Sequence, residues 1–301
     1  MKTEISLDIQ AQPNDETCGA TCLHALYRFY GVENLTLQQL IPEITRLPSG
    51  GTLAEVLACH ALERGFDATI YTYHLQMFDP SWFASDGEVH DPDNVIFRLR
   101  EQIKLKRKPD ARLKAATRAF VKFLEMGGQL KLEDLTPRLI SRYLSEGVPI
   151  ITGLSSTFLY RESRELSPAN IPDDVRGEPQ GHFVMLVGYD SERREVLVAD
   201  PLDENPPFYT NKYRLDIDRL VNAILLGAFT HDANLLIITP RDTERESSPK
   251  RKEAPARPPA KERGTSFAKP KHKPVTKPVT KPAAKAERAK RARRAAPEPD
   301  T

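Results

Sequence analysis

The sequence predicts an α+β domain over residues 1–240, in which helices come first and an antiparallel sheet follows. Helical periodicity dominates the early part of the chain, whereas the later part contains short apolar runs of strand length bounded by turn residues. This order is typical of α+β proteins, because strands that alternate with helices would instead predict a parallel sheet. The composition changes sharply near Pro240, so residues 241–301 are expected to form a separate segment.

The first predicted helix covers residues 18–30 and places a cysteine in its first turn. Thr17 is a suitable N-cap after an acidic pair, and Gly31 is a natural end. The helix dipole and the free backbone N–H groups of a first turn favour a thiolate, so Cys18 is a candidate nucleophile. The same N–H groups can receive an oxyanion. Gln12, six residues earlier, can donate a second hydrogen bond to it.

The remaining elements are expected in order along the chain. Further helices are predicted at residues 36–46, 53–64, 94–126 with a break at 104–109, and 135–145. Strands are predicted at residues 66–73, 147–154, 181–190 and 196–200, and residues 1–10 alternate like a short strand.

The last two predicted strands form a hairpin that carries a histidine and a carboxylate. His182 opens the first strand, the turn begins at Asp190, and Asp200 closes the second strand just before Pro201. The two outer ends of a hairpin lie side by side, so the carboxylate of Asp200 can hold the imidazole of His182. Cys22 and Cys59 lack such partners and are expected in the core.

At these residues the chain resembles the double-glycine-leader, or bacteriocin-processing, cysteine peptidase family and its papain-like relatives. The resemblance is carried by Gln12, Cys18-Gly19, His182-Phe183 and Asp200-Pro201, and it extends loosely over residues 5–240. It implies a papain-like fold, with an N-terminal catalytic helix packed on a C-terminal antiparallel sheet.

The same resemblance implies a role for each of the four residues. Cys18 would be the nucleophile, His182 the general base and acid, Asp200 the group that orients His182, and Gln12 the oxyanion donor. The usual reaction of the family is hydrolysis of a peptide bond through a thioester acyl-enzyme. Such domains are usually attached to membrane transporters, whereas this sequence contains no apolar span of ~20 residues.

The segment 155–180 is predicted to be a long loop that borders the active site, because it ends directly before His182. Three basic residues in it, Arg161, Arg164 and Arg176, can bind a substrate carboxylate through their forked guanidinium groups. The alternative is that they only form ion pairs with acidic residues of the same segment, and the sequence favours that alternative.

The charge of the chain is divided unequally between its two parts. Residues 241–301 hold 19 Lys+Arg and 8 Asp+Glu, a net charge of +11, which leaves −9 for residues 1–240. The tail is rich in Lys, Pro and Ala with few large apolar residues, so it is predicted to be disordered. A polyanion is its expected partner: nucleic acid, an acidic protein or an anionic membrane surface. The alternative is a solubilising tail without a specific partner.

Several classes of protein are excluded by what the sequence lacks. It contains no glycine-rich phosphate loop, no HExxH motif and no CxxC pair, so no metal and no organic cofactor is expected. Three cysteines do not make a disulfide framework, and the N-terminus lacks the apolar core of a signal peptide. A cytoplasmic location is therefore predicted. The oligomeric state does not follow from the sequence.

The leading hypothesis is a cysteine peptidase or amidohydrolase that acts on a peptide or amide. An acyl or peptidyl transferase is the second hypothesis, because an amine can resolve the same thioester instead of water. The third is a catalytically silent binding protein that uses the scaffold and the basic tail, since a fold does not fix a function.

Overall fold

The computed structural model describes residues 2–47, 50–106, 111–166, 170–202, 205, 207–230 and 232–241. The predicted basic tail lies outside the described residues apart from Arg241. Its disorder, and the domain boundary at residue 240, therefore remain predictions.

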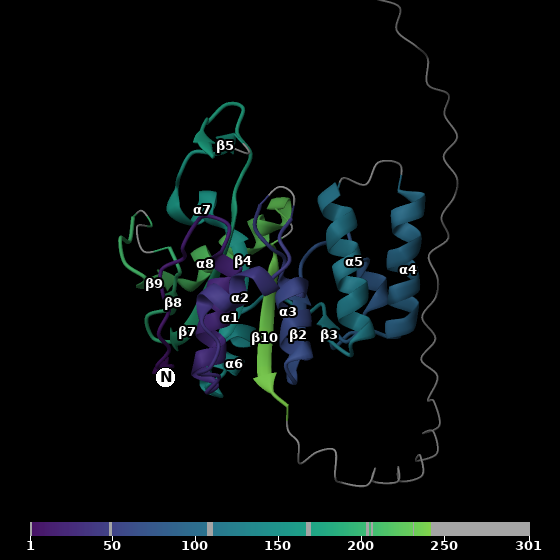
Figure 1. Cartoon of the computed structure of the whole chain (residues 1–301), viewed down its shortest axis with the longest axis horizontal. Helices are drawn as coiled ribbons and strands as arrows, with labels where there is room; N and C mark the ends of the chain where they lie inside the picture. The colour runs from purple at the N-terminus through teal and green to yellow at the C-terminus, as the bar shows by residue number, and fades with distance from the viewer. Residues whose placement is uncertain are drawn as a thin grey trace, which may run out of the picture. The chain divides into compact units, whose positions relative to one another are not determined.

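A large, mostly antiparallel sheet forms the middle of the domain (Figure 1). In the described residues its strands run in the order β3-β2-β10-β4-β7-β8-β9, and β1 also pairs with β7. Only the β2–β3 pair among these strands is parallel. The bounds of the sheet strands are β1 Lys2–Glu4, β2 Phe66–Thr72, β3 Gln129–Lys131, β4 Ile150–Ser155, β7 Gly181–Asp190, β8 Glu195–Ala199, β9 Lys212–Asp216 and β10 Asn234–Pro240. A small separate ladder joins β5, Glu165–Leu166, to β6, Ile171–Pro172.

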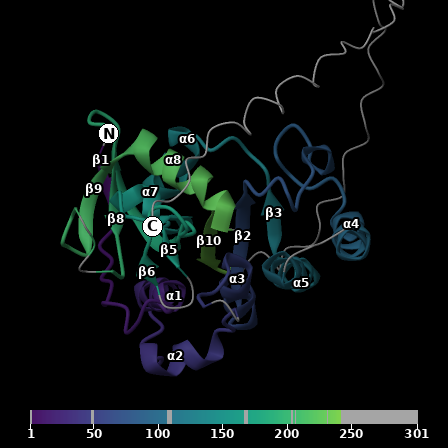
Figure 2. The same cartoon turned by 90° about the horizontal axis from the view of Figure 1, so that it is seen from above.

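Helices cover both faces of this sheet, as the view from above shows (Figure 2). On one side lie α1 Cys18–Phe29, α2 Leu37–Glu43 and α3 Ala54–Glu63, and on the other α6 Pro137–Ser145 and α8 Ile217–Leu226. The paired helices α4, Pro92–Leu105, and α5, Ala111–Glu125, lie beside the β2–β3 edge, and α5 packs on α3. The short helix α7, Ser156–Tyr160, follows β4 directly, and single 3-10 turns occupy Pro80–Trp82 and Gly227–Thr230.

The helix that begins at Cys18 packs on strand β7 of the antiparallel sheet, as the predicted α+β fold requires. Residues 18–27 of α1 are all buried. Gly19 permits this close packing, because a Cβ atom there would lie 2.6 Å from the γ-methyl of Thr52 and 3.3 Å from the ring of Phe183. The absence of a side chain at Gly19 therefore sets how near Cys18 can approach the sheet.

Both ends of α1 fall where the sequence places them, but one of the expected capping contacts differs. Thr17 occupies the N-cap position, yet its hydroxyl donates to the carbonyl of Asn14 rather than accepting from the helix. The far end is a Schellman motif: Gly31 has φ +84°, and the N–H of Val32 donates to the carbonyl of Tyr27 at 2.9 Å.

Most of the predicted elements are present, with one difference. The helical stretch 94–126 is broken as predicted, into two helices that end at Leu105 and begin at Ala111. The segment 155–180 contains α7 and the β5–β6 ladder instead of being a loop throughout. The α+β class is confirmed. No helix in the described ranges is long and apolar enough to cross a bilayer.

Candidate active site

Cys18 is the first residue of α1 and is largely buried. Its side chain faces a cavity of about 160 Å³ that also touches Gly50, Gly51 and Gly181. The first N–H groups of a helix have no partner within the helix, so they point toward this end of the molecule. A negative charge at or beside Cys18 is therefore stabilised by the helix.

His182 and Asp200 are brought together by the β7–β8 hairpin. Ala199 pairs with Met185 across the ladder, so the chain leaving β8 runs beside the first residues of β7. Nε2 of His182 lies 2.8 Å from Oδ1 of Asp200. This bond leaves Nδ1 as the ring nitrogen for Cys18, which interacts with His182 closely enough to raise the pKa of the imidazole. Thiol, imidazole and carboxylate thus form one interacting set.

The carboxylate of Asp200 is fully buried and receives three further hydrogen bonds. The hydroxyls of Tyr160 and Tyr213 each donate to Oδ2 at 2.7 Å, and the backbone N–H of Leu202 donates to Oδ1 at 2.9 Å. Sequence reasoning missed both tyrosines. Tyr160 lies in the segment predicted as a loop, and Tyr213 follows the hairpin, so no local pattern connects either residue to Asp200.

The charges in this set stabilise one another. Burial opposes a charged imidazole, but the charge and hydrogen bond of Asp200, together with Cys18, raise the pKa of His182 to about 10. Burial likewise opposes the carboxylate of Asp200. The charge and hydrogen bond of His182 and the two tyrosine hydroxyls nevertheless lower the pKa of Asp200 below its usual value. A charged His182–Asp200 pair is therefore favoured over the neutral one at neutral pH.

Gln12 lies in the segment before α1 and contacts the chain that follows Asp200. Its backbone N–H donates to the carbonyl of Pro201 at 2.8 Å, which ties the N-terminal segment to the residue after Asp200. Gln12, Tyr160 and His182 line a second cavity of about 230 Å³. Oε1 of Gln12 is buried and has no hydrogen-bond partner among the described residues.

The two cavities share several lining residues and form one cleft along Cys18 and His182. The shared residues are Asp15, Asn170, Gln180 and Gly181. Among the described residues the walls carry more carboxylates than cations: Asp15, Glu16, Glu162, Glu165 and Asp232 against Arg112 and the imidazolium of His182. Burial and the charges of Glu162 and Asp15 raise the pKa of Glu165, so these three groups repel one another.

Asp232 and Arg112 are wall residues for which the sequence offered no signal. Nη2 of Arg112 lies 3.4 Å from Oδ2 of Asp232. Asp232 is buried, and burial raises its pKa to about 6 although Arg112, Thr230 and His182 oppose the shift. The carboxyl of Glu55 is buried near this pair, and its Oε1 has no hydrogen-bond partner among the described residues.

The three arginines predicted as weak substrate-binding residues do not line either cavity. Arg176 forms an ion pair with Asp173 at 2.6 Å. Arg164 donates to the carbonyls of Asp174 and Val175. Arg161 ends α7 in a left-handed conformation with φ +60°. Of the three, only Arg176 pairs with an acidic side chain of its own segment, as the alternative expects, and substrate binding by the three arginines remains a prediction.

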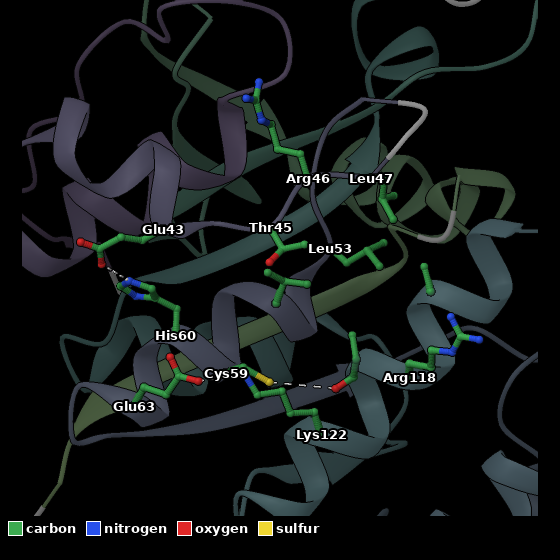
Figure 3. A pocket seen from close by; sticks show the side chains of 13 residues that line it. Glu43, Thr45, Arg46, Leu47, Leu53, Cys59, His60, Glu63, Arg118 and Lys122 are labelled. Carbon is green, nitrogen blue, oxygen red and sulfur yellow. Dashed lines mark hydrogen bonds and ion pairs between the residues drawn. The ribbon is translucent and has the colours of Figure 1, made fainter.

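The other two cysteines have the core positions that the sequence predicts. Cys22 is fully buried and its thiol lies 3.4 Å from the carbonyl of Phe183, and burial raises its pKa well above the usual value. Burial raises the pKa of Cys59 to about 11. Cys59 and His60 line a separate cavity of about 450 Å³ between α3, α5 and the segment after Glu43 (Figure 3). No group of three metal-ligating side chains occurs within the part of the chain that the structure describes.

Residues 133–218 match a family model described as the Peptidase_C39 like family. The chain therefore resembles C39-like peptidases. This C39-like segment contains His182 and Asp200 together with both tyrosines, whereas Cys18 and Gln12 lie before it. The resemblance predicted from the motifs is confirmed. No curated protein matches the chain.

Several solved structures are similar to the chain. One is named as a C39-like peptidase from Bacillus anthracis, with 12% identity, 81% of this chain and 100% of that chain covered, and a TM-score of 0.44. Another is a double glycine motif protease from an AMS/PCAT transporter, in complex with the leader peptide, with 14% identity, 79% and 95% coverage and a TM-score of 0.36. Xylellain, a cysteine protease from Xylella fastidiosa, has 14% identity, 80% and 86% coverage and a TM-score of 0.37.

Proposed function

We propose that this C39-like chain is a cysteine peptidase or amidohydrolase with Cys18 as its nucleophile and His182 as its general base and acid. One observation carries the proposal. The thiol at the start of α1 interacts with an imidazole whose Nε2 lies 2.8 Å from a buried carboxylate, and both groups raise the pKa of that imidazole. Nucleophile, base and orienting group in this order are the parts of a thiol hydrolase.

The proposed reaction runs in two halves. The Cys18 thiolate attacks the carbonyl carbon of the substrate, and the resulting oxyanion accepts hydrogen bonds from the start of α1 and from the side-chain amide of Gln12. The imidazolium of His182 gives its proton to the leaving amine, which departs and leaves a thioester. His182 then takes a proton from water, the hydroxide attacks the thioester, and the acid product leaves as the Cys18 thiolate and the His182 imidazolium are restored.

The cleft walls favour a substrate with positive charge near the bond that is cleaved. Asp15, Glu162 and Glu165 face the cavity beside His182, and among the described residues no cation other than His182 itself lines that cavity. A cleft lined by one sign of charge concentrates ligands of the opposite sign. A cationic peptide or amide is therefore the expected substrate class.

Labelling of the cysteines tests the proposal directly. Wild-type protein treated with a thiol-directed peptidyl warhead should gain one adduct, at Cys18, and the Cys18→Ala variant should gain none. Cys59→Ala is the matched control, because it removes a buried thiol outside the cleft and should label like wild type. Hydrolysis of a peptide mixture by wild type but not by Cys18→Ala completes the test. Slow, unselective labelling of all three cysteines would contradict the proposal and favour a silent binding protein.

A further inference from the structure

The side chain of Asp200 has its hydrogen-bonding capacity filled from four directions. Oδ1 accepts from Nε2 of His182 and from the N–H of Leu202, and Oδ2 accepts from the hydroxyls of Tyr160 and Tyr213. A carboxylate offers about four lone-pair sites. No site of Asp200 is therefore left over, and the group cannot rotate without breaking several of these bonds.

The two tyrosines reach Asp200 from different elements. Tyr213 is the second residue of β9, where it pairs with Val198 of β8, and the ring of Phe208 stacks on it at 3.8 Å. Tyr160 is the last residue of α7, and its ring lies 6.0 Å from that of His182. Two independently anchored rings therefore place their hydroxyls on one oxygen atom.

The helix that carries Tyr160 is itself held in place. Arg219 of α8 donates to the carbonyls of Phe158 and Leu159 at 2.8 and 2.7 Å. At the start of α7, the N–H of Ser156 donates to the carbonyl of Gln180 at 3.0 Å. Because a five-residue helix has little stability of its own, these contacts determine where the hydroxyl of Tyr160 lies.

We propose that Tyr160 and Tyr213 are positioning residues for His182, acting through Asp200. By donating to Oδ2 they keep Asp200 ionised and fix Oδ1 on Nε2 of His182, so that Nδ1 is held toward Cys18. Charge-assisted hydrogen bonds from a hydroxyl to a carboxylate are short and strong, and a buried carboxylate depends on them. The catalytic consequence rests on the proposed function, whereas the effect on the Cys18–His182 pair does not.

The hydroxyls can act only as donors in this arrangement. Burial and the charge of Asp200 raise the pKa of both Tyr160 and Tyr213 far above the usual value, so both remain protonated. The other titratable groups around Asp200 are His182 on β7 and Cys22 on α1. Around His182 they are Cys18 and Asp232.

The test measures the pH dependence of Cys18 alkylation in Tyr160→Phe, Tyr213→Phe and the double variant. Iodoacetamide labelling is followed by intact mass, so no substrate is needed. In wild type, labelling should persist at pH values well below ~8.5, the pKa of an ordinary thiol, because the imidazolium stabilises the thiolate of Cys18. Loss of one hydroxyl weakens the charged His182–Asp200 pair, so the midpoint should rise by roughly one pH unit, and by more in the double variant.

Tyr71→Phe is the matched control. Tyr71 is also fully buried and its hydroxyl lies 2.7 Å from that of Tyr143, but it lies outside the cleft. Its midpoint should equal that of wild type. If Tyr160→Phe and Tyr213→Phe lose thermal stability but keep the wild-type midpoint, their role is structural and the inference fails. If Tyr213→Phe does not fold, the labelling midpoint of Tyr160→Phe alone decides between the two roles.

Failure of the proposed function gives a different result. A wild type that labels selectively at low pH but cleaves no peptide would overturn the hydrolase proposal and leave the positioning role intact. A wild-type midpoint at the ordinary thiol value would overturn both.

Discussion

Oδ2 of Asp232 lies against the backbone of Gly181, at only 1.8 Å from the place where a Cβ atom of residue 181 would be. Gly181 directly precedes His182 at the start of β7. The carboxylate of Asp232 therefore occupies the space that a side chain at position 181 would need, so only glycine fits there. Gly181 and Asp232 also line this cavity together.

This contact predicts a strong coupling between positions 181 and 232. Gly181→Ala should lower the free energy of unfolding by about 1–3 kcal/mol, as overpacking of a rigid site usually does, and should displace His182. Gly181→Ala combined with Asp232→Ala should recover most of that loss, because the clashing carboxylate is gone. Urea unfolding of the four proteins in a double-mutant cycle measures the coupling. Additive effects would show that the two positions are independent.

The Cys18 helix and the β7–β8 hairpin could be predicted from the sequence because their signals are local. The helix is marked by a cap residue and a terminal glycine at its own ends. The hairpin is marked by two apolar runs on either side of a turn. Asp232, Arg112, Tyr160 and Tyr213 could not be placed at the site, because their positions depend on pairings between distant segments. Strand β10 shows why: it lies between β2 and β4, far from both in sequence. Thr17 shows that a suitable cap residue need not use its hydroxyl as one.

The raised pKa of His182 predicts that stability falls at alkaline pH. A histidine with a folded-state pKa of about 10 and an unfolded value near 6.5 stabilises the fold fully below pH 6.5. That contribution declines as pH rises from 6.5 and is lost above 10. It should amount to on the order of 5 kcal/mol when Cys18 is present. Urea unfolding between pH 6 and 10, in a Cys18→Ala background to remove the thiol, should show the decline, ending at a lower pH than in wild type because Cys18 contributes to the raised pKa of His182.

His182→Gln in the same background is the control for this decline. Without the imidazole, the free energy of unfolding should be much flatter over the same pH range. An equal slope in both proteins would assign the pH dependence to other groups.

Glu55 predicts the opposite kind of pH effect. Burial raises the pKa of this carboxyl to about 8, so ionising it in the folded state is unfavourable. The destabilisation caused by ionising Glu55 is absent below the unfolded-state pKa, which is near 4.5. It grows as pH rises and reaches its full size above pH 8. Glu55→Gln should therefore be close to neutral at pH 4 and stabilising by about 1–3 kcal/mol at pH 8. Thermal and urea unfolding at the two pH values give the comparison.

Glu63→Gln on the same helix is the matched control for Glu55. Glu63 is half-exposed and pairs with Lys122 at 2.8 Å, so its replacement should change stability by no more than about 0.5 kcal/mol. A stabilisation equal to that of Glu55→Gln would point to a general effect of charge on α3.

The basic tail predicts salt-dependent binding to polyanions. Residues 242–301 contain most of the positive excess of the chain, so their deletion should weaken binding to heparin or RNA and flatten its dependence on salt. Labelling of Cys18 should be unchanged by the deletion. Affinity measured at several salt concentrations tests this. Equal binding with and without the tail would favour a solubilising segment.

The acidic cleft predicts a preference for cationic substrates that mutation can remove. Peptides that differ only by Lys or Glu beside the cleaved bond should differ in kcat/KM by roughly tenfold in favour of Lys at low salt, and the difference should shrink as salt is added. Glu162→Gln with Glu165→Gln should remove most of it. Glu178→Gln is the matched control, because Glu178 is exposed on the same segment but lines neither cavity. If the control reduces the Lys preference as much as the double variant does, overall charge rather than the cleft selects the substrate.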